Sequence, residues 1–288
     1  MRAALTGMAA ALCLAIPAGA QAPPVGAPTM LAPVENPRDL NGVWHVTNSA
    51  RYNIEAHPAQ AAMQMREGPV IPVPAAEVEA LGAVGSVPAG ESVVTTNGGV
   101  IPYTAEAREE RDRRRANWIT EDPEIKCYLP GVPRATYQGL PLQIVHSDSS
   151  MLIVYAYANA VRNIEMEDPG EAPLDSWMGQ SYGQWDGDTL VVEVTAQNGQ
   201  TWFDRAGNHM SYAGTVTERY TKISPFHLHY SATIEDSETF TEPWTMEMVL
   251  YKDVDPDAKL HEFNCVEFVE ELMYGHLRKE PLDPVDDE

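Results

Sequence analysis

Twelve residues, TWFDRAGNHMSY at 201–212, bring together side chains that can move protons. A glycine-centred turn could fold Asp204 toward His209, and a histidine supported by a carboxylate works as a general acid or base near neutral pH. Arg205 could then hold a substrate carboxylate or stabilise an oxyanion, and Tyr212 could donate a proton. Aspartate, asparagine and glycine are also common in turns, so an ordinary solvated loop is the alternative.

A buried carboxylate is expected in the segment AGTVTERYT (213–221). Alternation along a strand places Val216, Glu218 and Tyr220 on one face, and the apolar face of a strand normally points inward. Burying Glu218 without a partner would cost several kcal/mol or force its protonation. Arg162 is the candidate donor, since it lies on the apolar face of its own strand-like segment. The pair would either fix strand register or form an interior site with a tuned carboxylate.

Aromatic side chains could line a cavity near these groups. Tyr155 and Tyr157 share a predicted strand face, and Trp177 lies near a predicted loop. The candidate ligand-binding residues are Tyr155, Tyr157, Trp177, Trp202 and Tyr220. In a wide barrel such a lining suits a flat or hydrophobic molecule, whereas in a filled barrel the same residues form the core.

A metal ion and an organic cofactor are not predicted. His227 and His229 could offer two imidazoles to a metal, with His209 or an acid as third ligand. However, Leu228 and Tyr230 belong to the apolar face of the same segment, so both histidines are expected to face outward. The sequence also has no Gly-x-Ser-x-Gly elbow, no glycine-rich phosphate loop before a helix and no dinucleotide fingerprint.

The segments that must position these residues follow a period of two from about residue 140 onward. Runs rich in β-branched and aromatic residues, such as LVVEVT and HYSATIE, alternate with turn signals. The strongest signal is Asp186-Gly187, which fits a two-residue hairpin, and further turns are expected at 147–150 and 224–225. A sequential meander leaves exposed edges unless it closes, so we predict a mainly β fold, an antiparallel meander closed into a barrel. NGVWHV (41–46) resembles the first strand of lipocalin-like barrels, where the tryptophan plugs one end.

Helices and loops are predicted outside the barrel strands. TAEAREERDRRRANW (104–118) reads as a charged helix whose arginines have acidic neighbours, which favours a solvated face over a binding patch. Poorly periodic residues before it indicate long loops, and together they form an insertion at about 50–138 in a single barrel domain over 41–279. VEFVEELMYGHL (266–277) has helical spacing and could pack against the barrel wall. The acidic residues 280–288 form a tail.

The first residues have the features of a secretory signal peptide over 1–22. Arg2 supplies the positive charge, the apolar run is too short to span a bilayer, and small-residue cleavage triplets follow. A proline-rich linker is expected over 23–40. We therefore expect an exported protein, periplasmic or secreted, without membrane insertion. The net charge of −23 argues against binding to nucleic acid and to anionic membrane surfaces.

Removal of this leader, which contains Cys13, leaves Cys127 and Cys265. One even pair in an oxidising compartment indicates a disulfide, which would close a loop of about 140 residues and stabilise the fold by up to roughly 5 kcal/mol. Two buried free thiols are the alternative. Neither cysteine has the spacing of a redox or zinc motif.

Several strings resemble a family of secreted, mostly uncharacterised bacterial proteins: CYLPGVPR, SWMGQSYGQWDGDTLVVEVT, WFDRAGN, ERYT, TIED and PWT. The resemblance covers most of the chain after the leader. The resemblance implies export, a β-rich fold and paired cysteines, and it implies no catalytic residue.

The function predicted from these residues is acid–base chemistry without a cofactor, of lyase or isomerase type, on a small hydrophobic or aromatic molecule. The residues assigned to this chemistry are Arg162 and Glu218 inside the barrel and Asp204, Arg205, His209 and Tyr212 at its rim. Two alternatives remain open: a non-catalytic binding or carrier protein for a hydrophobic ligand, and a structural envelope protein with a filled barrel. The oligomeric state is also open.

Overall fold

The computed structural model describes residues 34–59, 87–147 and 150–274, and within them nine strands form one antiparallel sheet. The predicted signal peptide, most of the predicted proline-rich linker and the acidic tail lie outside the described residues. In chain order the strands are β1 (Gly42–Val46), β2 (Leu142–His146), β3 (Met151–Tyr155), β4 (Val161–Ile164), β5 (Gln180–Asp186), β6 (Thr189–Thr195), β7 (Thr215–Ser224), β8 (His227–Glu235) and β9 (Trp244–Lys252).

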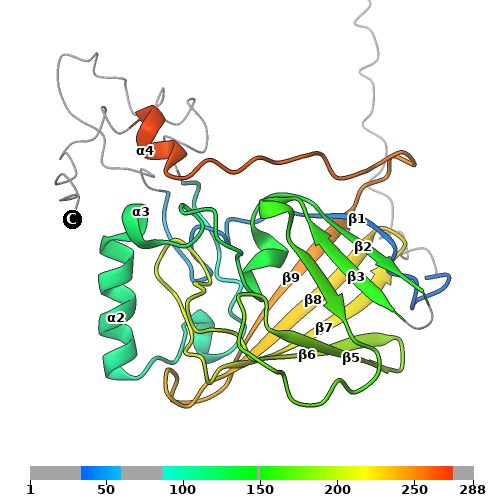
Figure 1. The fold of residues 1–288 in the computed structure, drawn as a ribbon, viewed down its shortest axis with the longest axis horizontal. Coiled ribbons are helices and arrows are strands. Elements are labelled where there is room, and N and C mark those ends of the chain that lie inside the picture. Colours follow the sequence, from blue (N-terminus) through cyan, green and yellow to red (C-terminus); the bar gives the residue numbers. More distant parts are fainter. Residues whose placement is uncertain (1–33, 60–86, 148–149, 275–288) are drawn as a thin grey trace, which may run out of the picture. The chain divides into compact units, whose positions relative to one another are not determined.

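The sheet forms a nearly closed barrel (Figure 1). The strand order is β4-β3-β2-β1-β9-β8-β7-β6-β5, so each pair joins consecutive strands except β1 with β9. Between the outer strands, the backbone N–H of Glu165 donates to the carbonyl of Ser181 at 2.9 Å, and the N–H of Gly183 donates to the carbonyl of Glu165 at 2.8 Å. We call this junction the β4–β5 seam. The predicted mainly β barrel is confirmed.

The predicted hairpins connect the strands, with one shift in position. Asp186 pairs with Thr189 across the β5–β6 hairpin, so the two turn residues are Gly187 and Asp188 rather than Asp186 and Gly187. Gly187 has a φ of 60°, a backbone conformation that glycine adopts without strain. The other two predicted turns join β2 to β3 and β7 to β8.

The chain joins the barrel before its first strand. Leu40, in the segment predicted as linker, is fully buried, and its carbonyl accepts a hydrogen bond from the indole Nε1 of Trp44 at 3.0 Å. Trp44 is also fully buried, and the Lys252 ammonium lies 5.7 Å from the centre of its ring. Arg38 donates to the carbonyl of Gly187 at 3.0 Å, which holds the entering chain against the β5–β6 turn.

Helices and short 3-10 turns lie in the connections: η2 (Asn97–Gly99), α2 (Ala105–Ala116), α3 (Trp118–Glu121), η3 (Arg134–Tyr137), η4 (Tyr157–Asn159) and α4 (Val269–Tyr274). Helix α2 confirms the predicted charged helix, with Thr104 capping its N-terminus. Arg113 is exposed and pairs with Glu121, as expected for a solvated face. Arg114 differs, because it is mostly covered and lies 5.5 Å from the centre of the Trp202 ring.

The chain after β9 returns along the barrel to the short helix α4 (Figure 1). A disulfide joins Cys127 to Cys265, with 5.7 Å between the Cα atoms, and confirms the predicted pair. Helix α4 is shorter than the predicted helix over 266–277, of which residues 275–277 lie outside the described residues. No helix in the described part of the chain combines the length and the apolar character needed to cross a bilayer.

Candidate functional site

The predicted interior carboxylate lies inside the barrel, bonded to its predicted partner. Glu218 on β7 is fully buried, and it accepts hydrogen bonds from Arg162, from the Tyr220 hydroxyl at 3.0 Å and from the Tyr230 hydroxyl at 2.8 Å. The guanidinium Nε of Arg162 donates to Ser181 Oγ at 2.7 Å. Alternation on β4 and β7 therefore places these groups as predicted.

Burial and the charge of Glu218 together keep the donors of this cluster protonated. Burial, reinforced by the Glu218 charge, raises the pKa of Tyr220 and Tyr230 well above the ordinary tyrosine value. Burial alone would lower the pKa of Arg162, but Glu218 outweighs it and raises that pKa. Each partner thus donates a hydrogen bond to the Glu218 carboxylate. These bonds fix the positions of the strands relative to one another across the barrel. Tyr155, also predicted to bind ligand, is buried in the same interior.

The stretch 201–212 forms a further hairpin, smaller than those of the barrel. Trp202 pairs with His209, and the N–H of Phe203 donates to the carbonyl of Asn208 at 2.6 Å. Gly207 at the tip has a φ of 83°, and a Cβ there would stand 2.5 Å from the backbone of α2. Glycine is required on both counts, and the hairpin tip packs directly against α2.

Asp204 fastens this hairpin rather than supporting a histidine. Its Oδ1 accepts from the N–H of Ala206 at 2.9 Å, and its Oδ2 accepts from the Asn208 amide at 2.7 Å and from the N–H of Ile54 at 2.8 Å. The predicted approach of Asp204 to His209 is therefore wrong, because nearby donors occupy the carboxylate. Burial, partly offset by these hydrogen bonds, raises the pKa of Asp204 to about 6.

His209 is a buried, neutral histidine. Its Nδ1 lies 3.1 Å from the carbonyl oxygen of Gly207, and its ring lies 5.7 Å from the ring of Tyr103. Burial, followed by the charge of Arg114, lowers the pKa of His209 to about 4. Because an ordinary histidine has a pKa near 6.5, acid should favour the unfolded chain, in which this residue is free to bind a proton.

Replacing His209 with glutamine should therefore remove a loss of stability in acid. As pH falls from 6.5 toward 4, the unfolded parent chain gains a proton that the folded chain excludes, which lowers its unfolding free energy by about 2–3 kcal/mol at pH 4.5. Urea unfolding of both proteins from pH 7.5 to 4.5 measures their unfolding free energies. As pH falls over this range, the unfolding free energy of the variant relative to that of the parent should rise by this amount. The same substitution at the exposed His261 is the control. Parallel pH curves for parent and His209→Gln would contradict a buried neutral histidine.

Arg205 holds carboxylates, as its type suggested, but they belong to the protein. It donates to both oxygens of Glu124 at 2.9 and 3.0 Å, and to Glu270 at 3.0 Å. Glu124 also accepts from Arg134 at 2.7 Å, and Arg134 donates to Asp122 at 2.6 Å. Burial alone would raise the pKa of Glu124, but Arg205 and Arg134 lower it to about 2. We call this chain of ion pairs, from Glu270 through Arg205, Glu124 and Arg134 to Asp122, the charge ladder. It connects α4 to the 201–212 hairpin.

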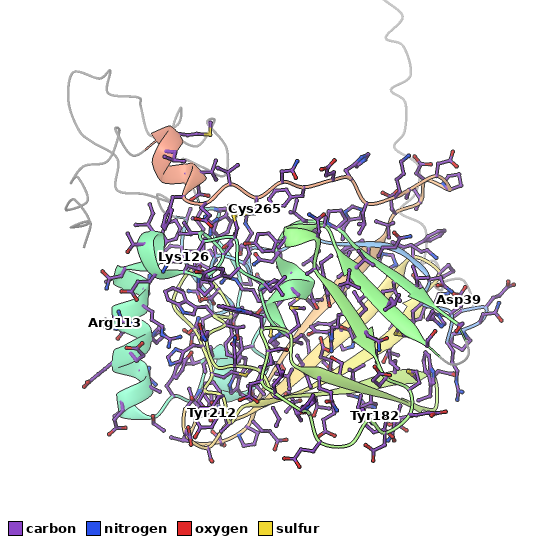
Figure 2. All side chains as sticks on the ribbon, in the orientation of Figure 1. Asp39, Arg113, Lys126, Tyr182, Tyr212 and Cys265 are labelled. Atoms are coloured by element: carbon purple, nitrogen blue, oxygen red, sulfur yellow. A yellow bond between two sulfur atoms is a disulfide. The ribbon has the colours of Figure 1, made fainter. Side chains whose placement is uncertain are left out.

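The other predicted residues are dispersed. Tyr212 is 64% exposed and lies well away from Cys265 (Figure 2). Within the described ranges its hydroxyl makes no hydrogen bond to another predicted catalytic residue. Tyr157 lies on η4, not on the strand that ends at Tyr155, and its hydroxyl donates to the carbonyl of Glu124 at 2.7 Å. Trp177 is partly covered, with its ring 5.2 Å from that of Tyr128.

Two predicted residues, Arg205 and Tyr157, line a pocket of about 300 Å³ beside the disulfide. We call it the disulfide pocket. Its apolar wall consists of Ile125, Leu140, Phe263, Val266 and Val269, and its polar lining includes Arg51, Glu124, Gln138 and Glu270. Apart from Arg205, Tyr157 and the cysteine, these lining residues were not predicted from the sequence. The cysteine pair was the available signal, because it brings the residues before Cys127 beside those around Cys265.

Arg51 differs from the other charged groups of the disulfide pocket. Its guanidinium carbon lies 4.4 Å from the centre of the Tyr52 ring, and its Nη2 donates to the Tyr52 hydroxyl. No acidic side chain in the described ranges pairs with it, whereas Arg205 and Glu124 neutralise each other. Arg51 therefore presents, next to an apolar wall, a guanidinium that no described carboxylate contacts, although its charge helps to lower the pKa of Glu124.

The second site, at the β4–β5 seam, is a pocket of about 290 Å³ that Arg162 and Ser181 help to line. Arg162 is nevertheless only 3% exposed, because it turns inward to Glu218. The polar interior cluster therefore reaches toward the surface at this seam, where the buried Nη1 of Arg162 has no hydrogen-bond partner within the described ranges.

The histidines considered for a metal site face outward, as predicted. His227 lies 2.6 Å from Ser224 Oγ, and His229 lies 3.3 Å from the carboxylate of Glu247. Among the described residues, no three His, Cys, Asp or Glu side chains are grouped to hold a metal ion.

Comparison with known proteins found no match. No family model matches the chain, and no significant match was found among curated proteins.

Proposed function

We propose that this protein is an exported, lipocalin-like barrel that binds a small, mainly apolar carboxylate in the disulfide pocket. The observation that carries the proposal is the guanidinium of Arg51, which no described carboxylate contacts, beside an apolar wall. A ligand carboxylate would supply a charge-assisted hydrogen bond, and its apolar part would cover Leu140 and Phe263. The disulfide between Cys127 and Cys265 supports export, because such bonds form in oxidising compartments.

A binding function fits the contacts of the predicted catalytic residues better than acid–base catalysis does. The carboxylates of Glu218 and Asp204 and the Nδ1 of His209 have hydrogen-bond partners within the protein. Lyase or isomerase chemistry stays a prediction from the sequence. It is tested in the binding samples themselves, where chromatography of the recovered ligand would reveal any new product.

Replacing Arg51 with methionine should remove selectivity for the carboxylate. Methionine keeps an unbranched apolar stem but has no charge, so only the head-group contact is lost. We expect the parent protein to bind 3-phenylpropanoate about 10- to 100-fold more tightly than 3-phenylpropanol, and the variant to bind both alike. Isothermal titration calorimetry with each compound measures the two affinities.

The matched control is Arg219→Met on β7, where an exposed arginine pairs with Asp186. This variant should keep the selectivity of the parent. Equal affinity of the parent for the acid and the alcohol would show that Arg51 does not select a carboxylate. Absence of binding of either compound at millimolar concentration would overturn the binding function and favour a structural role.

A further inference from the structure

A serine and a histidine form a hydrogen-bonded pair in the connection that follows β1. Ser49 Oγ lies 3.2 Å from Nε2 of His57, and the other ring nitrogen, Nδ1, lies 3.2 Å from the carbonyl oxygen of Pro58. A carbonyl oxygen can only accept, so Nδ1 carries the proton and Nε2 accepts from the serine hydroxyl. This is the tautomer that a general base needs beside a nucleophile.

The surrounding backbone holds the pair in place. His57 is 7% exposed, and it exchanges two backbone hydrogen bonds with Gly90, both of 3.0 Å. A Cβ at position 90 would stand 2.0 Å from Ser49 Oγ and 2.5 Å from His57 Nε2, so only glycine permits this approach. Ser49 also lines a pocket of about 590 Å³, which we call the Ser49 pocket. A buried base thus supports a serine that borders open space.

We propose that Ser49 and His57 form a catalytic dyad that hydrolyses esters in the Ser49 pocket. Ser49 Oγ attacks the acyl carbon while its proton passes to His57 Nε2. That proton then moves to the departing alcohol as the ester bond breaks, leaving an acyl-Ser49 ester. His57 next deprotonates a water molecule that hydrolyses this ester, which releases the carboxylic acid and returns the proton to Ser49.

The developing negative charge on the acyl oxygen has a donor at hand. The backbone N–H of Ser49 makes no hydrogen bond within the described ranges, and it is free to stabilise the oxyanion. Serine–histidine sites are recognised by such geometry and not by sequence position. The lack of a Gly-x-Ser-x-Gly elbow therefore does not count against this pair.

Charge in the Ser49 pocket selects the class of ester. Glu91 and Glu247 line the pocket, and its described lining includes no lysine or arginine. Val93 and Met248 supply apolar contact. The chain also carries a net charge of −23. The substrate class is therefore an uncharged or cationic ester, because an anionic acyl group would be repelled.

An alkyl fluorophosphonate, which reacts covalently with activated serines, tests the dyad on the full chain. Peptide mass spectrometry should find one adduct, on Ser49. His57→Gln should slow its formation by at least about 100-fold, and Ser49→Ala should abolish it. Ser237→Ala, in an exposed turn, is the control and should label like the parent.

Hydrolysis assays test the substrate class. The parent should hydrolyse 4-nitrophenyl acetate about tenfold faster than the mono-4-nitrophenyl ester of succinate, whose acyl group is anionic. A parent protein without an adduct on Ser49 would overturn the proposal, whatever the variants do. Equal labelling rates in the parent and in folded His57→Gln would overturn it too. Ligand binding in the disulfide pocket is measured without this reagent, so the two proposals fail independently.

Discussion

Replacing Arg162 with methionine should lower the unfolding free energy by about 3–5 kcal/mol, because the variant leaves a carboxylate buried without its cation. Glu218 is fully buried, and Arg162 is its only cationic partner within the described ranges. The two tyrosines that also donate to Glu218 are neutral and cannot balance its charge. Urea unfolding followed by tryptophan fluorescence at pH 7 measures the loss. If the variant does not fold at all, the loss of unfolding free energy is at least as large as the upper value expected.

The double variant Arg162→Met/Glu218→Gln separates lost charge balance from lost packing. Glutamine keeps the shape of Glu218 and still accepts from Tyr220 and Tyr230, so the double variant should recover most of the stability. Arg219→Met, on the same strand as Glu218 but exposed, should cost less than about 1 kcal/mol. A double variant as unstable as Arg162→Met would show that packing around the arginine, not its charge, is decisive.

Replacing Cys127 and Cys265 together with serine should lower the unfolding free energy by about 2–5 kcal/mol. The two cysteines are 138 positions apart, so the bond restricts a large part of the unfolded chain. The same substitution should weaken ligand binding in the disulfide pocket. Chain from both sides of the bond lines that pocket, including Ile125 and Val266.

Thermal unfolding and calorimetric titration with 3-phenylpropanoate measure these two effects on one preparation. Other contacts also hold this segment, among them the ion pair of Arg205 with Glu270, the ring contact of Phe263 with Tyr157 at 5.8 Å, and the hydrogen bond from the N–H of Phe268 to the carbonyl of Ile125 at 2.9 Å. These contacts are non-covalent, so they should hold the segment less firmly than the disulfide. Unchanged affinity in the double serine variant would mean that the non-covalent contacts suffice to form the pocket.

Residues on the regular strands could be placed from the sequence, because their facing depends on strict alternation. TVTERYT was sufficient to put Glu218 and Tyr220 inside the barrel, and the requirement for a buried cation then pointed to Arg162. No long-range information was needed beyond the rule that a buried charge has a partner. The cysteine pair could be predicted for a similar reason, since only two cysteines lie outside the predicted signal peptide.

Residues in the irregular connections could not be placed in this way. The carboxylate of Asp204 accepts from the N–H of Ile54, which is 150 positions away, and no local pattern reveals that contact. Arg51 and the pair of Ser49 and His57 lie where the backbone has no period. Their neighbours are set by how the connections pack on the barrel. The irregular half of the chain therefore holds the groups that sequence patterns overlooked.

The position of the β4–β5 seam has a consequence for the topology of the chain. Starting at β5, the strands follow one another around the barrel to β9, pass to β1 and end at β4. Among the described strands, only the pairing of β1 with β9 joins strands that do not follow one another in the chain. The molecule is thus a circular permutation of a plain nine-strand meander. A chain opened between β4 and β5, with its present ends joined, would pair every strand with its immediate successor and have its new termini at the seam.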